Sequence, residues 1–267
     1  MVDAVGTNRY TYDNAGRLLT EDGPWDSDTV TLTYNNRLRS GLSLAQPGVS
    51  AWSQSYTYEG GSRLKTISGP AGTFTYTYDS ARRMLPSTVA LPGGAYISNS
   101  YDSSARETDT RLMNSAGVEL NYHHYVYNTL SQRTSQTRQS GDYAEYTYDK
   151  IGQLKTARGK EPDGATSRLH EQFGYAYDAA GNLQYRTNNA LLQAFSVNSL
   201  NELTAGSRSG TFTVAGSVGQ RVSPVSVAVS GTGLSSGSAS VYADGTWARA
   251  GATLADGQNT YNVSATD

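Results

Sequence analysis

The chain has 267 residues, of which 21 are basic and 23 acidic, for a net charge of −2. This balance argues against nucleic acid or an anionic membrane surface as a partner, because no basic stripe is present. Cysteine is absent, which excludes disulfides and thiolate metal sites. No apolar run approaches the ~20 residues that a membrane-spanning helix needs, and the first residues do not resemble a signal peptide.

One short motif returns again and again along the chain. Its clearest copies are Tyr10–Leu18, Tyr146–Leu154 and Tyr175–Leu183, which share the pattern Tyr-x-Tyr-Asp-x-x-Gly-x-Leu. Repetition with a period of roughly 20–30 residues predicts a stacked array. Weaker copies surround Tyr34, Tyr56/Tyr58, Tyr76/Tyr78, Tyr101 and Tyr125/Tyr127, and a degenerate copy runs from Phe195 to Leu203.

Each copy predicts a β-hairpin. In an extended strand the two tyrosines project from one face and the residue between them from the other. Aspartate and glycine then supply a turn, because the carboxylate bonds nearby amides and glycine accepts a left-handed backbone. The residues that define these hairpins are Tyr10, Tyr12, Asp13, Gly16, Tyr56, Tyr58, Tyr76, Tyr78, Asp79, Tyr146, Tyr148, Asp149, Gly152, Tyr175, Tyr177, Asp178 and Gly181.

Some copies depart from the pattern. Arg82 and Ala105 stand where glycine is expected, which predicts looser turns. The pair Asn35-Asn36 predicts a shorter turn, and the turn signal Glu161–Gly164 predicts an extra excursion in the widest gap between copies.

The aromatic composition indicates how wet the sheet is. The chain has 20 tyrosines but 4 phenylalanines, and a tyrosine hydroxyl needs water or a hydrogen-bond partner. We therefore expect a thin, curved sheet with solvent on both faces. The alternative is that these rings form the core of a β-sandwich, in which phenylalanine, isoleucine and valine are normally commoner.

The sequence changes character near residue 209. Tyr-Asp couplets stop, and short alternating runs such as 211–214, 225–229 and 261–265 are separated by glycine-rich breaks. This spacing predicts a small β-sandwich over residues 209–267, with Trp247 in its core. Its last residues resemble the final strands of bacterial Ig-like modules; the module is either incomplete or an insert between repeats.

The motif copies resemble the YD-repeat, or Rhs, family, which includes bacterial Rhs proteins, toxin-complex shells and teneurins. The resemblance covers about residues 8–205. It implies a sheet of stacked hairpins that spirals into a hollow shell, which encloses a toxin in several members and serves cell-surface contact in others. We find no counterpart of the family's C-terminal self-cleavage motif. The expected fold is therefore all-β, with a YD-repeat array over residues 1–208 followed by an Ig-like β-sandwich.

No pattern predicts catalysis, a cofactor or a metal site. His123 and His124 are adjacent, so on a strand they point to opposite faces, and His170 is distant from both. The repeated aspartates occupy a fixed place in the turn, which favours capping over acid–base chemistry. We expect the arginines that follow the turns to lie along tyrosine rings; they are Arg17, Arg37, Arg63 and Arg83.

The sequence thus predicts a non-enzymatic structural segment of an Rhs-like shell that encloses or presents a toxin or effector. Alternatives are a cell-surface repeat that binds glycans or proteins through exposed tyrosine and arginine, and an extracellular fibre that self-associates through sheet edges. The expected partners are further repeats of a larger chain, toxin cargo, a glycan or a surface protein. The expected location is extracellular or on a bacterial cell surface.

Overall fold

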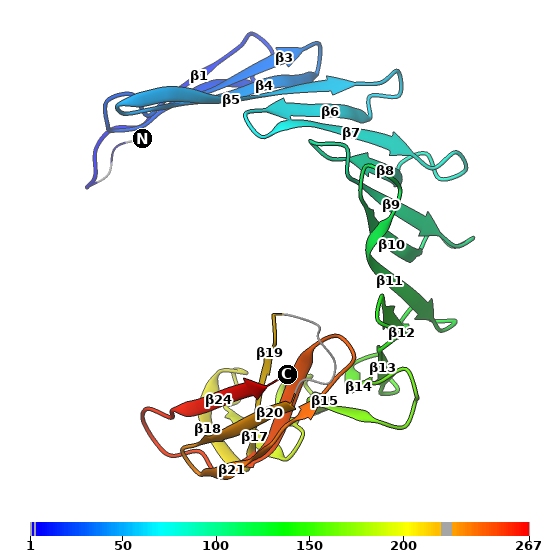
Figure 1. Cartoon of the computed structure of the whole chain (residues 1–267). Coiled ribbons are helices and arrows are strands. Elements are labelled where there is room, and N and C mark those ends of the chain that lie inside the picture. The colour runs from blue at the N-terminus through cyan, green and yellow to red at the C-terminus, as the bar shows by residue number, and fades with distance from the viewer. Residues whose placement is uncertain (1, 3, 220–225, 267) are drawn as a thin grey trace. The chain divides into compact units, whose positions relative to one another are not determined.

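The computed structural model describes residues 2, 4–219 and 226–266, and all its regular elements are β-strands, 24 in number (Figure 1). This confirms the all-β prediction. Within the described residues no helix is long and apolar enough to cross a membrane. The chain divides into two compact units, Met1–Tyr122 and His123–Asp267.

In the first unit, every strand pairs antiparallel with the next strand in sequence. The predicted chain of hairpins is therefore present. Its strands are β1 (Arg9–Tyr12), β2 (Leu18–Asp22), β3 (Val30–Asn35), β4 (Leu38–Gln46), β5 (Val49–Tyr58), β6 (Leu64–Gly69), β7 (Gly72–Tyr78), β8 (Pro86–Ala90), β9 (Tyr96–Tyr101) and β10 (Glu107–Met113).

The hairpins continue through the second unit with the same sequential antiparallel pairing. The first of these strands, β11, spans the division between the units. The strands are β11 (Glu119–Tyr127), β12 (Arg133–Arg138), β13 (Tyr143–Tyr148), β14 (Leu154–Lys160), β15 (Ser167–Tyr177), β16 (Leu183–Asn188), β17 (Leu191–Val197) and β18 (Leu203–Gly210).

Two three-stranded sheets follow, in the orders β19-β23-β22 and β21-β20-β24. We call them the small module. Their strands are β19 (Phe212–Ser217), β20 (Ser226–Gly231), β21 (Leu234–Ser238), β22 (Ser240–Val241), β23 (Thr246–Ala252) and β24 (Tyr261–Thr266). Val225, which belongs to a predicted strand run, lies outside the described residues. The boundary predicted at residue 208 and the Ig-like assignment remain predictions.

The alternation of tyrosine and threonine builds the hairpins from both faces. The threonine between the tyrosines lies opposite a second threonine on the returning strand, and the two hydroxyls are 2.6 Å apart in the pairs Thr11–Thr20 and Thr147–Thr156. Such cross-strand pairs contribute about 0.2–1 kcal/mol each. The register then slips at the second tyrosine of the motif, as at Tyr12 and Tyr148, which is the β-bulge expected beside a turn of this kind.

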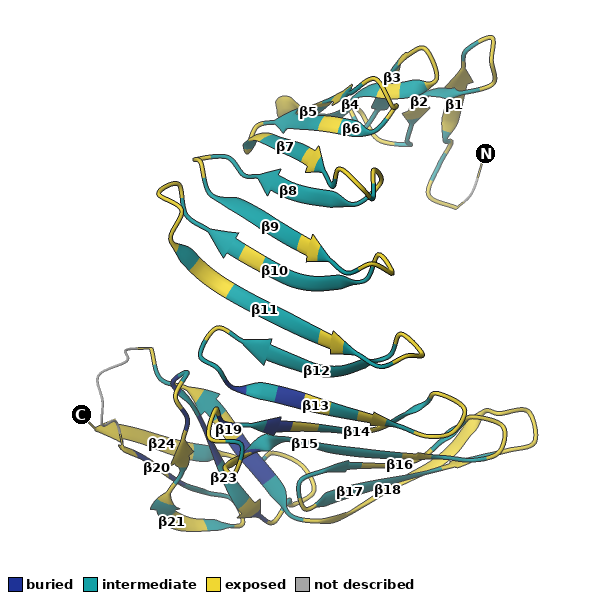
Figure 2. Cartoon of the chain, turned by 90° about the vertical axis from the view of Figure 1, so that its right-hand side faces the viewer, coloured by how far each residue is buried: buried dark blue, intermediate teal, exposed yellow. Residues whose placement is uncertain are grey.

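The hairpins bury few side chains completely. No residue from Thr33 to Gly141 is buried (Figure 2). The small module has a compact core instead, formed by Val214, Val227, Val229, Trp247 and Ala252. The predicted core position of Trp247 is confirmed, since its exposed fraction is 5%.

Candidate functional site

The repeat turn is the first candidate site, and Asp13 shows its geometry. The Asp13 amide donates to the Arg17 carbonyl at 2.9 Å, and the Gly16 amide donates to the Asp13 carbonyl at 3.0 Å. Oδ1 of Asp13 accepts the amides of Ala15 and Arg17 at 2.8 and 2.9 Å. Gly16 has a φ of +76°, which favours glycine. The backbone amide of Arg17 is the largest cause that lowers the pKa of Asp13.

The same turn recurs at the other motif aspartates. Asp149 and Asp178 each accept the amides two and four residues ahead, and Gly152 and Gly181 have positive φ. Asn128 makes the same two bonds through its amide oxygen. Because an uncharged side chain closes the turn equally, the feature these positions share is hydrogen-bond acceptance.

The turns without glycine differ from one another. Arg82 is part of a longer loop, since the Asp79 amide reaches the carbonyl of Leu85 and not that of the fourth residue ahead. The looser turn predicted at Ala105 is wrong. Ala105 has a φ of +62°, and Asp102 closes the turn with the same two backbone bonds as Asp13. The Asp102 side chain also holds Arg106, so it outweighs a left-handed alanine that costs about 1 kcal/mol.

The other predicted turns lie where the sequence places them. Asn35 pairs with Leu38 across a two-residue turn, as the shorter turn predicted. The excursion at Glu161–Gly164 is the turn between β14 and β15, and it carries Glu161 toward the small module.

The second tyrosine of the motif joins one hairpin to the hairpin before it. The hydroxyl of Tyr78 donates to the Leu64 carbonyl at 2.6 Å, and that of Tyr148 donates to the Arg133 carbonyl at 2.7 Å. Burial raises the pKa of Tyr78 and that of Tyr101, which keeps the donating proton in place. The equivalent donors and acceptors are Tyr34 to Leu18, Tyr58 to Arg39, and Tyr101 to Pro86.

The first tyrosine of the motif has local partners. The Tyr56 hydroxyl donates to Gln54 at 2.9 Å, and that of Tyr146 donates to Gln136 at 3.1 Å. Tyr76 lies opposite Val89, and Tyr175 lies opposite Arg186. These rings therefore stabilise their own neighbouring strands. The remaining motif tyrosines are Tyr10, which donates to Glu21, and Tyr12 and Tyr177, which lie opposite Leu18 and Leu183.

The residue before the motif leucine links consecutive turns, a contact that the sequence did not reveal. Arg17 donates to the Asn36 carbonyl and its guanidinium lies 4.6 Å from the Tyr34 ring centre. Arg63 repeats both contacts, with the Arg83 carbonyl and the Tyr78 ring. The stacking predicted for Arg17 and Arg63 is thereby confirmed. Shorter side chains make equivalent links, from Gln132 to Gly152 and from Asn182 to Asn201.

A buried ion cluster around Arg168 is the second candidate site. Arg168 is 1% exposed, and its guanidinium lies 2.7 Å from Glu161, 3.0 Å from Glu171 and 2.7 Å from Asp244. Asp142 is 3.5 Å away. Asp244 belongs to the small module, so the cluster fixes that module to β15 and to the excursion turn.

Further bonds reinforce the same junction. The Leu169 amide donates to the Tyr242 hydroxyl at 2.7 Å, and the Ala243 amide donates to Glu161 at 3.1 Å. The Arg168 guanidinium also lies 4.9 Å from the centre of the Tyr242 ring. On the sheet side, Arg138 pairs with Glu171 at 2.9 Å.

The cluster holds its carboxylates in the charged form. Burial opposes ionisation of Glu171, but hydrogen bonding from His170 and the charges of Arg138 and Arg168 outweigh it and lower the pKa to about 2. Burial likewise opposes ionisation of Asp244, but bonds from Arg168 and Thr246 lower its pKa to about 2. A general acid or base works best with a pKa near the working pH, so these two groups suit a structural junction.

The histidines do not converge. His123 lies within 3.1 Å of Gln136 and stacks on Tyr125. His170 lies 3.4 Å from Glu171. Within residues 2, 4–219 and 226–266, no group of three histidine, aspartate or glutamate side chains could hold a metal ion.

Residues 6–109 match the family model described as Teneurin YD-shell. This segment belongs to that family. The YD-shell match includes the first turn, the tyrosine links from Tyr34 to Tyr101 and the two stacked arginines. A comparison with curated protein sequences found no match.

Solved structures agree with the fold of the YD-shell segment. A structure of the Photorhabdus luminescens Tc holotoxin pore with a TccC3 mutation matches with a TM-score of 0.55 and 15% identity. The match covers 82% of this chain and 12% of the other. A crystal structure titled TcdB2-TccC3-Cdc42 matches with a TM-score of 0.46 and 12% identity, over 96% of this chain and 16% of the other. This chain thus spans less than a fifth of the chains that it matches.

Gly16→Ala tests the turn, because a Cβ on Gly16 meets no atom within 4 Å. Only the positive φ opposes the new methyl group, so we expect a loss of about 1 kcal/mol, measured by hydrogen exchange of the β1–β2 amides. The matched control is Gly60→Ala, in a turn with equal space but without a positive φ. Equal protection in both variants would refute the turn's dependence on φ.

Arg168→Met tests the ion cluster. Removing the guanidinium leaves buried carboxylates without their partner, so we expect the small module to lose about 3–5 kcal/mol, measured by denaturant unfolding followed through Trp247. Arg208→Met is the control, since the Arg208–Asp256 pair is exposed and such pairs contribute little. Equal stability of the two variants would contradict the assigned role.

The cluster also predicts an acid transition. The pKa values of Glu171 and Asp244 are lower in the folded chain than in the unfolded one, so their stabilisation is complete above about pH 4.5 and is lost as the pH falls toward 2. Wild-type protein should lose stability of the small module in that range, and Arg168→Met should lose less. An identical acid response in both would oppose this assignment.

Proposed function

We propose that this chain is a non-enzymatic wall segment of an Rhs-like shell, which encloses or presents a toxin or effector. The observation that carries the proposal is the repeated link between hairpins. A tyrosine hydroxyl reaches back to the preceding hairpin, as from Tyr78 to Leu64, and an arginine reaches forward to the next turn, as from Arg63 to Arg83. Both links use backbone carbonyls, so they make the sheet continuous without a thick apolar core.

The chemistry of the buried groups supports a structural role. The carboxylates with the largest shifts, Glu171 and Asp244, are held ionised and paired with arginine. The titles of the matched structures name toxin complexes, which supports toxin cargo and further repeats of a larger chain as partners. An extracellular location accompanies that role.

Accessibility of the two sheet faces tests enclosure in the full-length protein. Thr57 and Ile67 lie on neighbouring strands, with Thr57 opposite Thr66 and Ile67 opposite Tyr56, so they face opposite sides of the sheet. The chain has no cysteine, and the variants Thr57→Cys and Ile67→Cys therefore report single positions if the rest of the protein is cysteine-free. Each is labelled in turn with a small maleimide and with a polyethylene-glycol maleimide.

A closed wall should protect one face from the large reagent only. We expect both positions to react with the small maleimide and one of them to resist the large reagent by at least about tenfold, since a lumen admits reagents by size. Denaturation should abolish the difference. If the large reagent reaches both faces of the native protein as readily as the small one, the enclosing role is wrong.

A further inference from the structure

A cavity of about 420 Å³ opens beside the loop between β2 and β3. Its lining includes Arg9, Asp22, Trp25 and Asp26. The volume lies in the lower part of the range for small-molecule sites, ~300–1,000 Å³. None of the turns already described contributes to it, so the cavity is separate from the links between hairpins.

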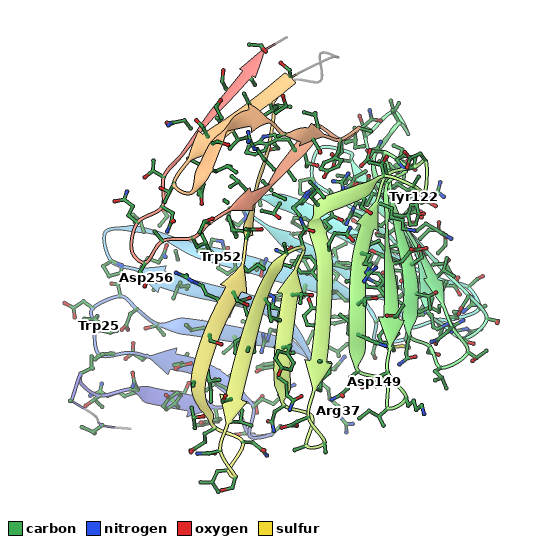
Figure 3. The ribbon with its side chains drawn as sticks, turned by 90° about the horizontal axis from the view of Figure 1, so that it is seen from below. Trp25, Arg37, Trp52, Tyr122, Asp149 and Asp256 are labelled. Carbon is green, nitrogen blue, oxygen red and sulfur yellow. The ribbon has the colours of Figure 1, made fainter. Side chains whose placement is uncertain are left out.

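Trp25 is the unusual member of this group. Its exposed fraction is 65%, and Figure 3 shows it on the loop beyond the strand ends. An indole ring carries large apolar area together with one N–H donor. Exposure of that area is unfavourable unless a ligand covers it.

Local bonds hold the loop around Trp25 in place. The Asp28 carboxylate accepts the amides of Gly23 and Trp25, each at 2.9 Å. Thr29 donates to Asp22 at 2.5 Å, which ties the loop to the end of β2. The tryptophan is therefore presented by a closed loop, and little order has to be gained when a ligand binds.

Two glycines make this packing possible. A Cβ on Gly23 would lie 2.2 Å from the Asp28 carboxylate, and one on Gly6 would lie 2.4 Å from the side chain of Pro24. Both distances are too short for a real contact. The wall of the cavity thus depends on close backbone approach from two segments of the chain.

The polar lining complements the ring. Arg9 lies directly opposite Asp22 in the β1–β2 register, and Asp26 follows Trp25 on the exposed loop. Carboxylate and guanidinium groups accept and donate paired hydrogen bonds, which suits vicinal hydroxyls. Two carboxylates against one guanidinium disfavour an anionic ligand.

We propose that this cavity binds a neutral saccharide, with a pyranose ring stacked on Trp25 and its hydroxyls bonded to Asp22, Asp26 and Arg9. A pyranose ring presents C–H groups on its faces and hydroxyls at its rim, which matches an indole bordered by charged acceptors and a donor. This binding does not depend on the wall function, since it uses neither the tyrosine links nor the ion cluster.

Calorimetric titration with free glucose, galactose, mannose, N-acetylglucosamine and their disaccharides tests the site. We expect at least one of them to bind with a Kd of about 1 mM and to change the tryptophan fluorescence. Trp25→Ala should weaken that binding at least about tenfold, and Asp26→Asn should weaken it by a smaller factor. Because both side chains are exposed, neither variant should alter thermal unfolding.

Trp52→Ala is the matched control, since Trp52 is 36% exposed on β5 and does not line the cavity. It should keep the affinity of the wild type. The proposal is overturned if no saccharide of this panel binds, if binding survives Trp25→Ala, or if an oligolysine peptide binds at Trp25 while the saccharides do not.

Discussion

The hydrogen bonds that a single side chain donates no proton to, but accepts at the start of each turn, underlie the rest of the hairpin array. When Asp13 accepts the amides of Ala15 and Arg17, it fixes the turn and the bulge beside it. The bulge sets the position of the second tyrosine in the motif. In later copies, that ring reaches the carbonyl of the preceding hairpin, as Tyr78 reaches Leu64. A local turn thus determines the contact between hairpins.

This arrangement explains how a sheet with so little dry core holds together. From Thr33 to Gly141 no side chain is fully buried, so hydrophobic burial within one hairpin is small. Stability then comes from neighbour contacts, as in other repeat proteins. The small module follows a different rule, with an apolar core around Trp247 and a buried ion cluster around Arg168 at its junction with β15. Such a cluster adds specificity of docking more reliably than net stability.

The sequence predicts the hairpins because each motif carries its own turn chemistry. It fails at Ala105, where the bonds made by Asp102 hold a residue that lacks glycine's freedom. It also misses the Arg168 cluster, because Asp244 lies 76 residues away in sequence and no local pattern connects the two. The forward link from Arg17 to Asn36 is hidden for a related reason, since arginine, glutamine and asparagine all serve at that position.

Native-state hydrogen exchange of Tyr78→Phe measures the link between hairpins most directly. The variant keeps the ring and removes the donor to Leu64, a bond of about 1 kcal/mol. We expect protection to fall in β7 and also in the preceding β5–β6 hairpin, whereas Tyr12→Phe, at a ring that is 58% exposed, leaves both unchanged. Loss of protection confined to β7, or no loss at all, would contradict an array held together by its tyrosines.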